Sequence, residues 1–333
     1  MRLRYWLAWL IPVLPAGVIF AQGVAGGPAP AAPAAEQADE EANLFAAPTR
    51  LDRIGRIVAP VMINGQGPFR FIIDTGASHS TLSPALAAKL GLKISADSLI
   101  EVNGITGTAQ VPAVRVQKLQ AGDLQIENTD FPVVWAPLMA GADGILGAAG
   151  LTQQRLTVDF EHNRVVISRA GRRTIPSGYM RLRAQRVTGG LITVTALVGG
   201  VRVRAVIDTG SERSLGNLAL QDALSHRRFA AVSRTTKVYG ATSDVVPGDA
   251  QRAPTIAIDD MRIADVTLVF GDFHIFKVWN MEDKPALIIG MDVLGTVQSL
   301  GIDFQHADLF INGSRTIGTD SDPVHSFVTS RPR

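Results

Sequence analysis

Short apolar segments that alternate with turn residues run along most of the chain, and they come in pairs. Residues 56–65, RIVAPVMING, are rich in Val and Ile and end in Asn-Gly, and residues 67–74, GPFRFIID, follow a Gly-Gln-Gly-Pro turn. Residues 191–200, LITVTALVGG, and residues 201–208, VRVRAVID, show the same arrangement. Each pair predicts a β-hairpin whose second strand ends at an aspartate.

A helix is expected after each hairpin. In SPALAAKLGL, residues 83–92, Ser83 is placed to cap the helix, Pro84 to start its first turn and Gly91 to end it. Residues 216–226, GNLALQDALSH, are the counterpart. Many short strands with about one helix in each half predict a mainly β fold with a barrel-like architecture.

The two hairpins belong to a longer internal repeat. IIDTGASHS recurs as VIDTGSERS, so that Asp74 and Asp208 stand 134 residues apart. Three further pairs of blocks recur in the same order, at offsets that grow from 136 to 144 residues. They are EVNGITGTAQVP with KVYGATSDVVPG, GILGAAGL with LIIGMDVLG, and TVDFEHNRVVI with GIDFQHADLFI. The repeat predicts two homologous lobes, at 49–170 and 178–314, joined by a linker at 171–177.

The two ends of the chain differ from the repeats. Residues 1–25 combine Arg2 and Arg4 with an apolar run and then small residues, which is typical of a secretory signal peptide; an uncleaved membrane anchor is the alternative. Residues 26–48 are rich in Ala and Pro, and residues 315–333 look similar, so we expect a disordered linker and a flexible tail. The leader predicts export to a periplasm or the extracellular space, with a membrane tether if it is kept.

Composition excludes several classes of function. The 32 basic and 30 acidic residues include Arg2 and Arg4 of the leader, so a mature chain carries 30 of each, and no Lys/Arg stripe suited to nucleic acid is visible. The six histidines lack metal-ligand spacing, so we expect neither a metal nor any other cofactor. Cysteine is absent, so the core must be stable by packing alone.

An aspartate that ends a buried strand and is followed by Thr and Gly has a chemical logic. Gly76 and Gly210 let the backbone turn sharply and present N–H groups near each acid, while Thr75 and Thr209 supply hydroxyls that can bond across a symmetry axis. If the two units pack about a pseudo-twofold axis, the two acids meet. Two adjacent carboxyls share one proton, so one can act as a base toward water while the other donates a proton.

These motifs resemble those of aspartic proteases of the retropepsin and pepsin superfamily, and the lobe length resembles two retropepsin-like units fused in one chain. Each Asp-Thr-Gly has a downstream apolar-apolar-Gly signature, at 145–147 and at 288–290, which in that family braces the catalytic strand. The resemblance implies two β-barrel lobes about a pseudo-twofold axis. It also implies Asp74 and Asp208 as the catalytic pair, with Thr75 and Thr209 bracing it.

The family also places a β-hairpin flap over the cleft in each lobe. Position nominates the hairpins around Asn103-Gly104 and around Tyr239-Gly240, where VYGATS resembles the Tyr-Gly flap tip of pepsin-like enzymes. We expect Tyr239 to close over substrate and Asn103 not to do so. Tyr239 as an ordinary strand aromatic remains the alternative.

A second asymmetry lies three residues after each acid, where Ala77 matches Ser211. A Ser211 hydroxyl bonded to its own aspartate would favour the charged form, so Asp208 is expected to ionise first and Asp74 to hold the proton.

Other polar residues near the motifs have two interpretations each. His79, Glu212 and Arg213 follow the catalytic loops and either line substrate subsites or are solvated. Asp159 and Asp303 are expected to be structural, each before a terminal hairpin. Asp292 has only Ala149 as its counterpart and is expected to be an ion-pair partner.

The sequence therefore predicts an exported aspartic endopeptidase that acts on protein or peptide substrates, with no nucleic acid partner. A non-catalytic peptide-binding or scaffold protein that keeps the bilobal cleft is the alternative. Because both halves lie in one chain, we expect a monomer.

Overall fold

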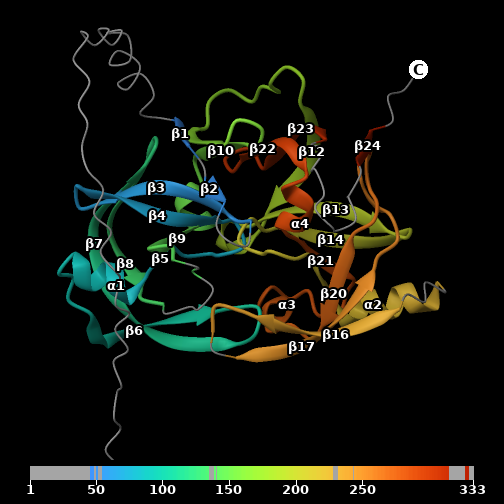
Figure 1. Cartoon of the computed structure of the whole chain (residues 1–333), viewed down its shortest axis with the longest axis horizontal. Helices are drawn as coiled ribbons and strands as arrows, with labels where there is room; N and C mark the ends of the chain where they lie inside the picture. The colour runs from blue at the N-terminus through green and yellow to red at the C-terminus, as the bar shows by residue number, and fades with distance from the viewer. Residues whose placement is uncertain are drawn as a thin grey trace, which may run out of the picture. The chain divides into compact units, whose positions relative to one another are not determined.

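The chain is described by a computed structural model (Figure 1) that covers residues 46–48, 50–51, 55–134, 139, 141–227, 232–242, 244–314 and 327–329. The expected signal peptide at 1–25 lies outside the described residues, as does most of the expected linker and tail. In the part of the chain that is described, no helix is long and apolar enough to cross a membrane.

The first lobe is built on one eight-stranded sheet, in the order β5-β9-β4-β3-β7-β6, with β2 added to β3 and β8 added to β7. Its strands are β2 (Arg50–Leu51), β3 (Ile57–Ile63), β4 (Gln66–Asp74), β5 (Thr81–Leu82), β6 (Ser95–Asn103), β7 (Thr108–Ala121), β8 (Leu124–Pro132) and β9 (Gly144–Gly147).

The second lobe repeats this plan along the path β13-β14-β21-β15-β20-β17-β16, with β18, β19 and β24 off that path. Its strands are β13 (Ile192–Val198), β14 (Val201–Ile207), β15 (Leu215–Asn217), β16 (Ser233–Tyr239), β17 (Val245–Arg252), β18 (Ile256–Ile258), β19 (Met261–Ile263), β20 (Thr267–Gly271), β21 (Ala286–Ile289) and β24 (Phe327–Thr329).

A shared sheet joins the two lobes. Its order is β1-β11-β10-β22-β23-β12, and it continues through β12 into β13 of the second lobe. The strands are β1 (Ala46–Pro48), β10 (Gln154–Asp159), β11 (Arg164–Arg169), β12 (Met180–Arg186), β22 (Val297–Asp303) and β23 (Asp308–Ser314). The antiparallel pair β10 and β22 brings the terminal hairpins of both repeats side by side.

Two segments expected to be irregular contain strands. The last three residues of the linker predicted at 26–48 form β1, which pairs with β11. Within the tail predicted at 315–333, β24 pairs with β19. Composition did not reveal either strand, because an edge strand is held by backbone hydrogen bonds to its neighbour, which almost any side chains permit.

The two predicted helices are present, each with a side-chain cap. α1 (Pro84–Lys89) begins after Ser83, whose hydroxyl accepts from the Leu86 N–H, and Gly91 follows it with φ of +62°. α2 (Leu218–His226) begins after Asn217, which accepts from the Leu220 N–H. Two shorter helices are α3 (His274–Val278) and α4 (Met291–Leu294), and two short 3-10 segments are η2 (Ala148–Leu151) and η3 (Thr188–Gly190). The fold is mainly β, and its two lobes are two copies of the same structural unit.

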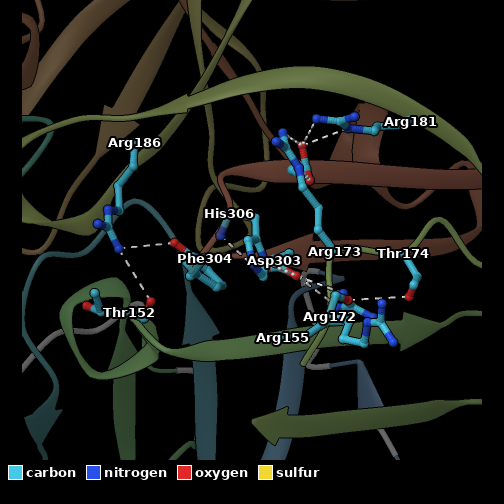
Figure 2. Close-up of polar contacts among 11 residues, drawn as sticks. Thr152, Arg155, Arg172, Arg173, Thr174, Arg181, Arg186, Asp303, Phe304 and His306 are labelled. Atoms are coloured by element: carbon cyan, nitrogen blue, oxygen red, sulfur yellow. Dashed lines mark hydrogen bonds and ion pairs between the residues drawn. The ribbon is translucent and has the colours of Figure 1, made fainter. Parts of the chain in front are cut away.

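Apolar side chains from both repeats form one continuous core. Buried strand residues such as Ile73 of the first lobe and Ile207 of the second belong to the same cluster. On the shared sheet, Arg155 of β10 binds Asp303 of β22, as Figure 2 shows, and Arg173 and Arg181 bind Asp308. The lobes are therefore joined by a sheet, by apolar packing and by the ion pair between Arg155 and Asp303.

Candidate active site

The two repeated aspartates meet where the lobes face each other. Asp74 is the last residue of β4, and Asp208 directly follows β14. Their carboxyls are hydrogen-bonded to one another, and Asp208 is 6% exposed. The hairpins predicted from sequence thus bring one aspartate from each lobe next to the other.

The threonines after the acids join the two loops symmetrically. The Thr75 hydroxyl donates to the Ile207 carbonyl at 2.7 Å, and the Thr209 hydroxyl donates to the Ile73 carbonyl at 2.6 Å. Each hydroxyl also accepts from the backbone N–H of the opposite threonine, at 3.1 and 3.2 Å. Both residues are fully buried, so these four bonds fix the spacing of the two Asp-Thr-Gly loops.

The glycines of both motifs are required by close packing across the axis. A Cβ at Gly76 would overlap the carboxyl of Asp208, and a Cβ at Gly210 would overlap that of Asp74. The bare backbone also supplies donors. The N–H groups of Gly76 and Ala77 donate to Asp74 Oδ1 at 3.0 and 2.8 Å, and that of Gly210 donates to Asp208 Oδ1 at 2.8 Å.

The electrostatics of the pair are unequal. Burial raises the pKa of both carboxyls. For Asp74 the rise in pKa is opposed by the hydrogen bond from Asp208, by backbone N–H groups and by the charge of Arg56. For Asp208 the charge of Asp74 adds to burial, so its pKa lies well above the usual value. Burial and the charge of Asp74 thus favour the protonated form of Asp208.

The contact expected of the Ser211 side chain was wrong. The Ser211 hydroxyl donates to the Arg213 carbonyl at 2.7 Å instead of to Asp208, and the Ser211 backbone contributes a bond to that carboxyl. The hydroxyl cannot favour the charged form of Asp208 in the expected way, because a backbone carbonyl in the same turn accepts its hydrogen bond.

The two apolar-apolar-Gly signatures lie beside the catalytic strands. β9 runs parallel to β4 with Gly147 beside Asp74, and β21 runs parallel to β14 with Ile289 beside Ile207. In the second lobe the Asp208 N–H also donates to the Ile289 carbonyl at 3.0 Å. Each aspartate is thus held from its own side by a buried parallel strand.

A cleft of about 270 Å³ opens above the pair, and both flap hairpins line it. Asn103 and Gly104 come from the turn between β6 and β7, and Tyr239 and Gly240 come from the end of β16. Many of the other lining side chains are apolar, among them Ile105, Met139, Ile145, Leu215, Val269, Ile275 and Trp279. An acid pair under an apolar, two-sided cover is suited to an extended peptide.

Comparison with known proteins decides the family. The aspartyl protease family model matches the chain twice, at residues 59–149 and 194–293, which together exceed half of its length. The chain belongs to the aspartyl protease family. It carries two retropepsin-like units in tandem, as the sequence predicted. No curated protein matches it.

The two flaps of this aspartyl protease touch each other. Thr106 Oγ1 and Thr242 Oγ1 lie 2.9 Å apart, and both residues are buried. A Cβ at Gly104 would come within 3.2 Å of the Ala241 backbone nitrogen. The sequence analysis did not predict this contact. A signal was present, since Thr106 and Thr242 occupy equivalent positions in NGIT and YGAT.

A histidine of the second lobe holds the flap of the first. His274, the first residue of α3, has its Nε2 at 2.7 Å from Thr108 Oγ1 and 3.3 Å from Asn103 Oδ1. Thr108 in turn donates to Asn103 at 2.6 Å. Asn103 is therefore tied to the opposite strand of its own hairpin and to α3, whereas Tyr239 is 54% exposed at the cleft.

The remaining polar residues separate into two groups. Glu212 and Arg213 line the cleft, whereas the exposed His79 contacts Ser78 at 2.9 Å through its ring nitrogen. Asp292 accepts two bonds from Ser214, whose hydroxyl in turn accepts from the Gly290 N–H at 3.0 Å. Asp292 thus braces the apolar-apolar-Gly turn of the second lobe.

One charged cleft residue escaped the sequence analysis altogether. Arg56 is only 5% exposed and lines the cleft together with both aspartates. As for metals, the described residues contain no group of three or more His, Cys, Asp or Glu side chains that could hold an ion.

Proposed function

We propose that the chain is an exported aspartic endopeptidase that hydrolyses peptide bonds at Asp74 and Asp208. The observation that carries this proposal is the pair of buried, mutually bonded carboxyls at the floor of a flap-covered cleft. A pair that shares one proton carries one base and one acid at the same point.

The reaction follows from that arrangement. A water molecule between the carboxyls gives a proton to the ionised carboxylate as its oxygen adds to the peptide carbonyl carbon. The protonated carboxyl gives its proton to the carbonyl oxygen, which yields a neutral tetrahedral diol. Transfer of the first proton to the amide nitrogen then permits the C–N bond to break, and a diol hydroxyl returns a proton to the pair.

Protein or peptide substrates fit the cleft better than small molecules do. The flap hairpins offer strand edges to an extended chain, and the apolar lining offers pockets for alternate side chains. Because one chain supplies both aspartates, the proposal requires only a monomer. Export to the periplasm or the extracellular space, with a membrane tether if the leader is kept, rests on residues 1–25.

The test compares the wild type with Asp74→Asn and Asp208→Asn on a diverse peptide library between about pH 3 and pH 8. We expect cleavage by the wild type and a loss of at least about a thousandfold in each variant. Asp159→Asn, on the β10–β11 hairpin, is the matched control and should cleave normally. Retained cleavage in either dyad variant would overturn the assignment. Peptide binding without cleavage by the wild type would favour the scaffold alternative.

A further inference from the structure

Arg56 precedes β3 directly and lines the same cleft as Asp74. Strand β3 pairs with β4 through Val58 and Ile72, and each step along one strand is a step back along the other. Continued two steps past that last pair of the ladder, the same register brings residue 56 opposite residue 74. Directly opposed residues on antiparallel strands project their side chains from the same face, with Cβ atoms about 5 Å apart.

The second hairpin places an apolar residue at the equivalent position. Strand β13 pairs with β14 through Thr193 and Val206, and the same register, continued two steps past that last pair of the ladder, brings Leu191 opposite Asp208. Leu191 is 2% exposed. The two catalytic carboxyls therefore differ in their nearest cross-strand neighbour, a guanidinium in one lobe and a leucine in the other.

We propose that Arg56 is a positioning residue that makes the two aspartates inequivalent, holding Asp74 as the carboxylate that receives the water proton and leaving Asp208 as the acid. The roles rest on the proposed function, whereas the location of the proton does not. The proton count is unchanged: one moves from water to Asp74, one moves from Asp208 to the carbonyl oxygen, and the pair keeps a single negative charge.

The electrostatic evidence agrees with this geometry. Arg56 is among the main influences that lower the pKa of Asp74, after burial and hydrogen bonding, whereas no cation is among those that act on Asp208. Burial keeps Arg56 from being screened by solvent, so its charge acts at close to full strength on the neighbouring carboxyl.

Other titratable groups also face the cleft, and they are placed differently. Glu212 and Arg213 form a 3.7 Å pair with side chains 46% and 58% exposed, so their charges largely cancel and are screened. Lys237 and Tyr239 come from the flap strand β16. In the described hairpins none of these four stands at the cross-strand position of either aspartate.

The first experiment measures the pH dependence of kcat/KM for the full chain and for Arg56→Gln, Arg56→Lys and Arg164→Gln. We expect Arg56→Gln to move the acid limb upward by about one pH unit, because the carboxylate loses its neighbouring cation. Arg56→Lys keeps a positive charge and should show little of this shift. Arg164→Gln removes an equal charge from an exposed position on β11 that does not line the cleft, and it should leave the limb in place. An unshifted limb in Arg56→Gln would overturn the proposal.

The second experiment needs no substrate. The wild type is labelled with ¹³C at the aspartate carboxyls, and the two signals are assigned with Asp74→Asn and Asp208→Asn. We expect Asp74 to lose its proton first, and we expect both signals to move together in Arg56→Gln. Asp208 ionising first would overturn the inference even if peptides are cleaved. Asp74 ionising first without any cleavage would retain the proton location and contradict the proposed function instead.

Discussion

At the scale of single residues, the site depends on the absence of a side chain at two glycines as much as on the side chains that are present. Gly76 and Gly210 each lie against the carboxyl of the opposite lobe, so the two acids can approach only because neither glycine carries a Cβ. The neighbouring threonines then fix the distance through bonds to the opposite backbone. The spacing of the two acids is thus set by the glycines and threonines that follow them.

Gly76→Ala tests this dependence. The new methyl group would overlap the Asp208 carboxyl, so the loop or the acid must move. We expect kcat/KM to fall by about a hundredfold or more, and the free energy of unfolding to fall by about 1–3 kcal/mol. Peptide cleavage assays and urea unfolding measure the two effects.

Gly171→Ala is the matched control for that change. No atom lies within 4 Å of a Cβ at Gly171, and the residue is exposed in the linker between the lobes. Its activity and stability should equal those of the wild type. Wild-type activity in Gly76→Ala would show that the two catalytic loops do not need their close approach.

At the scale of elements, the two flap hairpins have the same topology but different attachments. The hairpin of β6 and β7 is tied to α3 through His274, whereas the hairpin of β16 and β17 presents Tyr239 at the cleft. Their tips meet at Thr106 and Thr242. We infer that the first flap is anchored and that the second provides the aromatic contact with substrate.

Tyr239→Ala and Asn103→Ala distinguish these roles. Loss of the Tyr239 ring should lower kcat/KM by about tenfold to a hundredfold, because a large apolar contact over the substrate is lost. Asn103→Ala should have a much smaller effect. Peptide cleavage kinetics for both variants provide the measurement. Equal losses would contradict a special role for Tyr239 and favour its being an ordinary strand aromatic.

At the scale of the whole molecule, the two lobes are joined on the shared sheet by a buried charge pair. Asp303 of β22 is fully buried and receives two bonds from Arg155 of β10, in the other lobe (Figure 2). Burial alone would raise the pKa of Asp303, but bonds from Arg155 and His306 outweigh it and hold the pKa below its usual value. At the repeat-related position, Asp159 faces Ser299 and bonds only within its own turn.

Asp303→Asn should therefore lower the stability of the folded protein. We expect the free energy of unfolding at neutral pH to fall by about 1–3 kcal/mol, because Arg155 loses its ionic partner. A lowered carboxyl pKa contributes stability that is complete above the unfolded value near 4 and is lost as pH falls through the folded value. The difference from wild type should therefore shrink below about pH 4.

Asp159→Asn is the control, because it removes the equivalent carboxylate where no arginine crosses from the other lobe. Urea unfolding at several pH values should show a smaller loss for Asp159→Asn than for Asp303→Asn. Equal losses would mean that the ion pair between the lobes adds nothing beyond the turn hydrogen bonds that both aspartates make.

The sequence by itself determined the parts of this protein that repeat. Two Asp-Thr-Gly motifs, two hairpins, two capped helices and two apolar-apolar-Gly strands could be read from periodicity and turn residues, because local preferences govern them. Twofold repetition also predicted that Asp74 and Asp208 would meet, since only packing the two units about an axis brings equivalent residues together.

Only the tertiary structure decided how the two halves differ. The β3–β4 hairpin changes register between Val61 and Ile63, and without that shift Gly55 and not Arg56 would face Asp74. A one-residue slip reverses which face a side chain occupies, and no local preference signals it. The Ser211 hydroxyl likewise donates to the Arg213 carbonyl, which only the folded turn brings near it. Symmetry follows from the repeated sequence, whereas the differences between the surroundings of the two aspartates depend on register and burial, which exist only once the chain is folded.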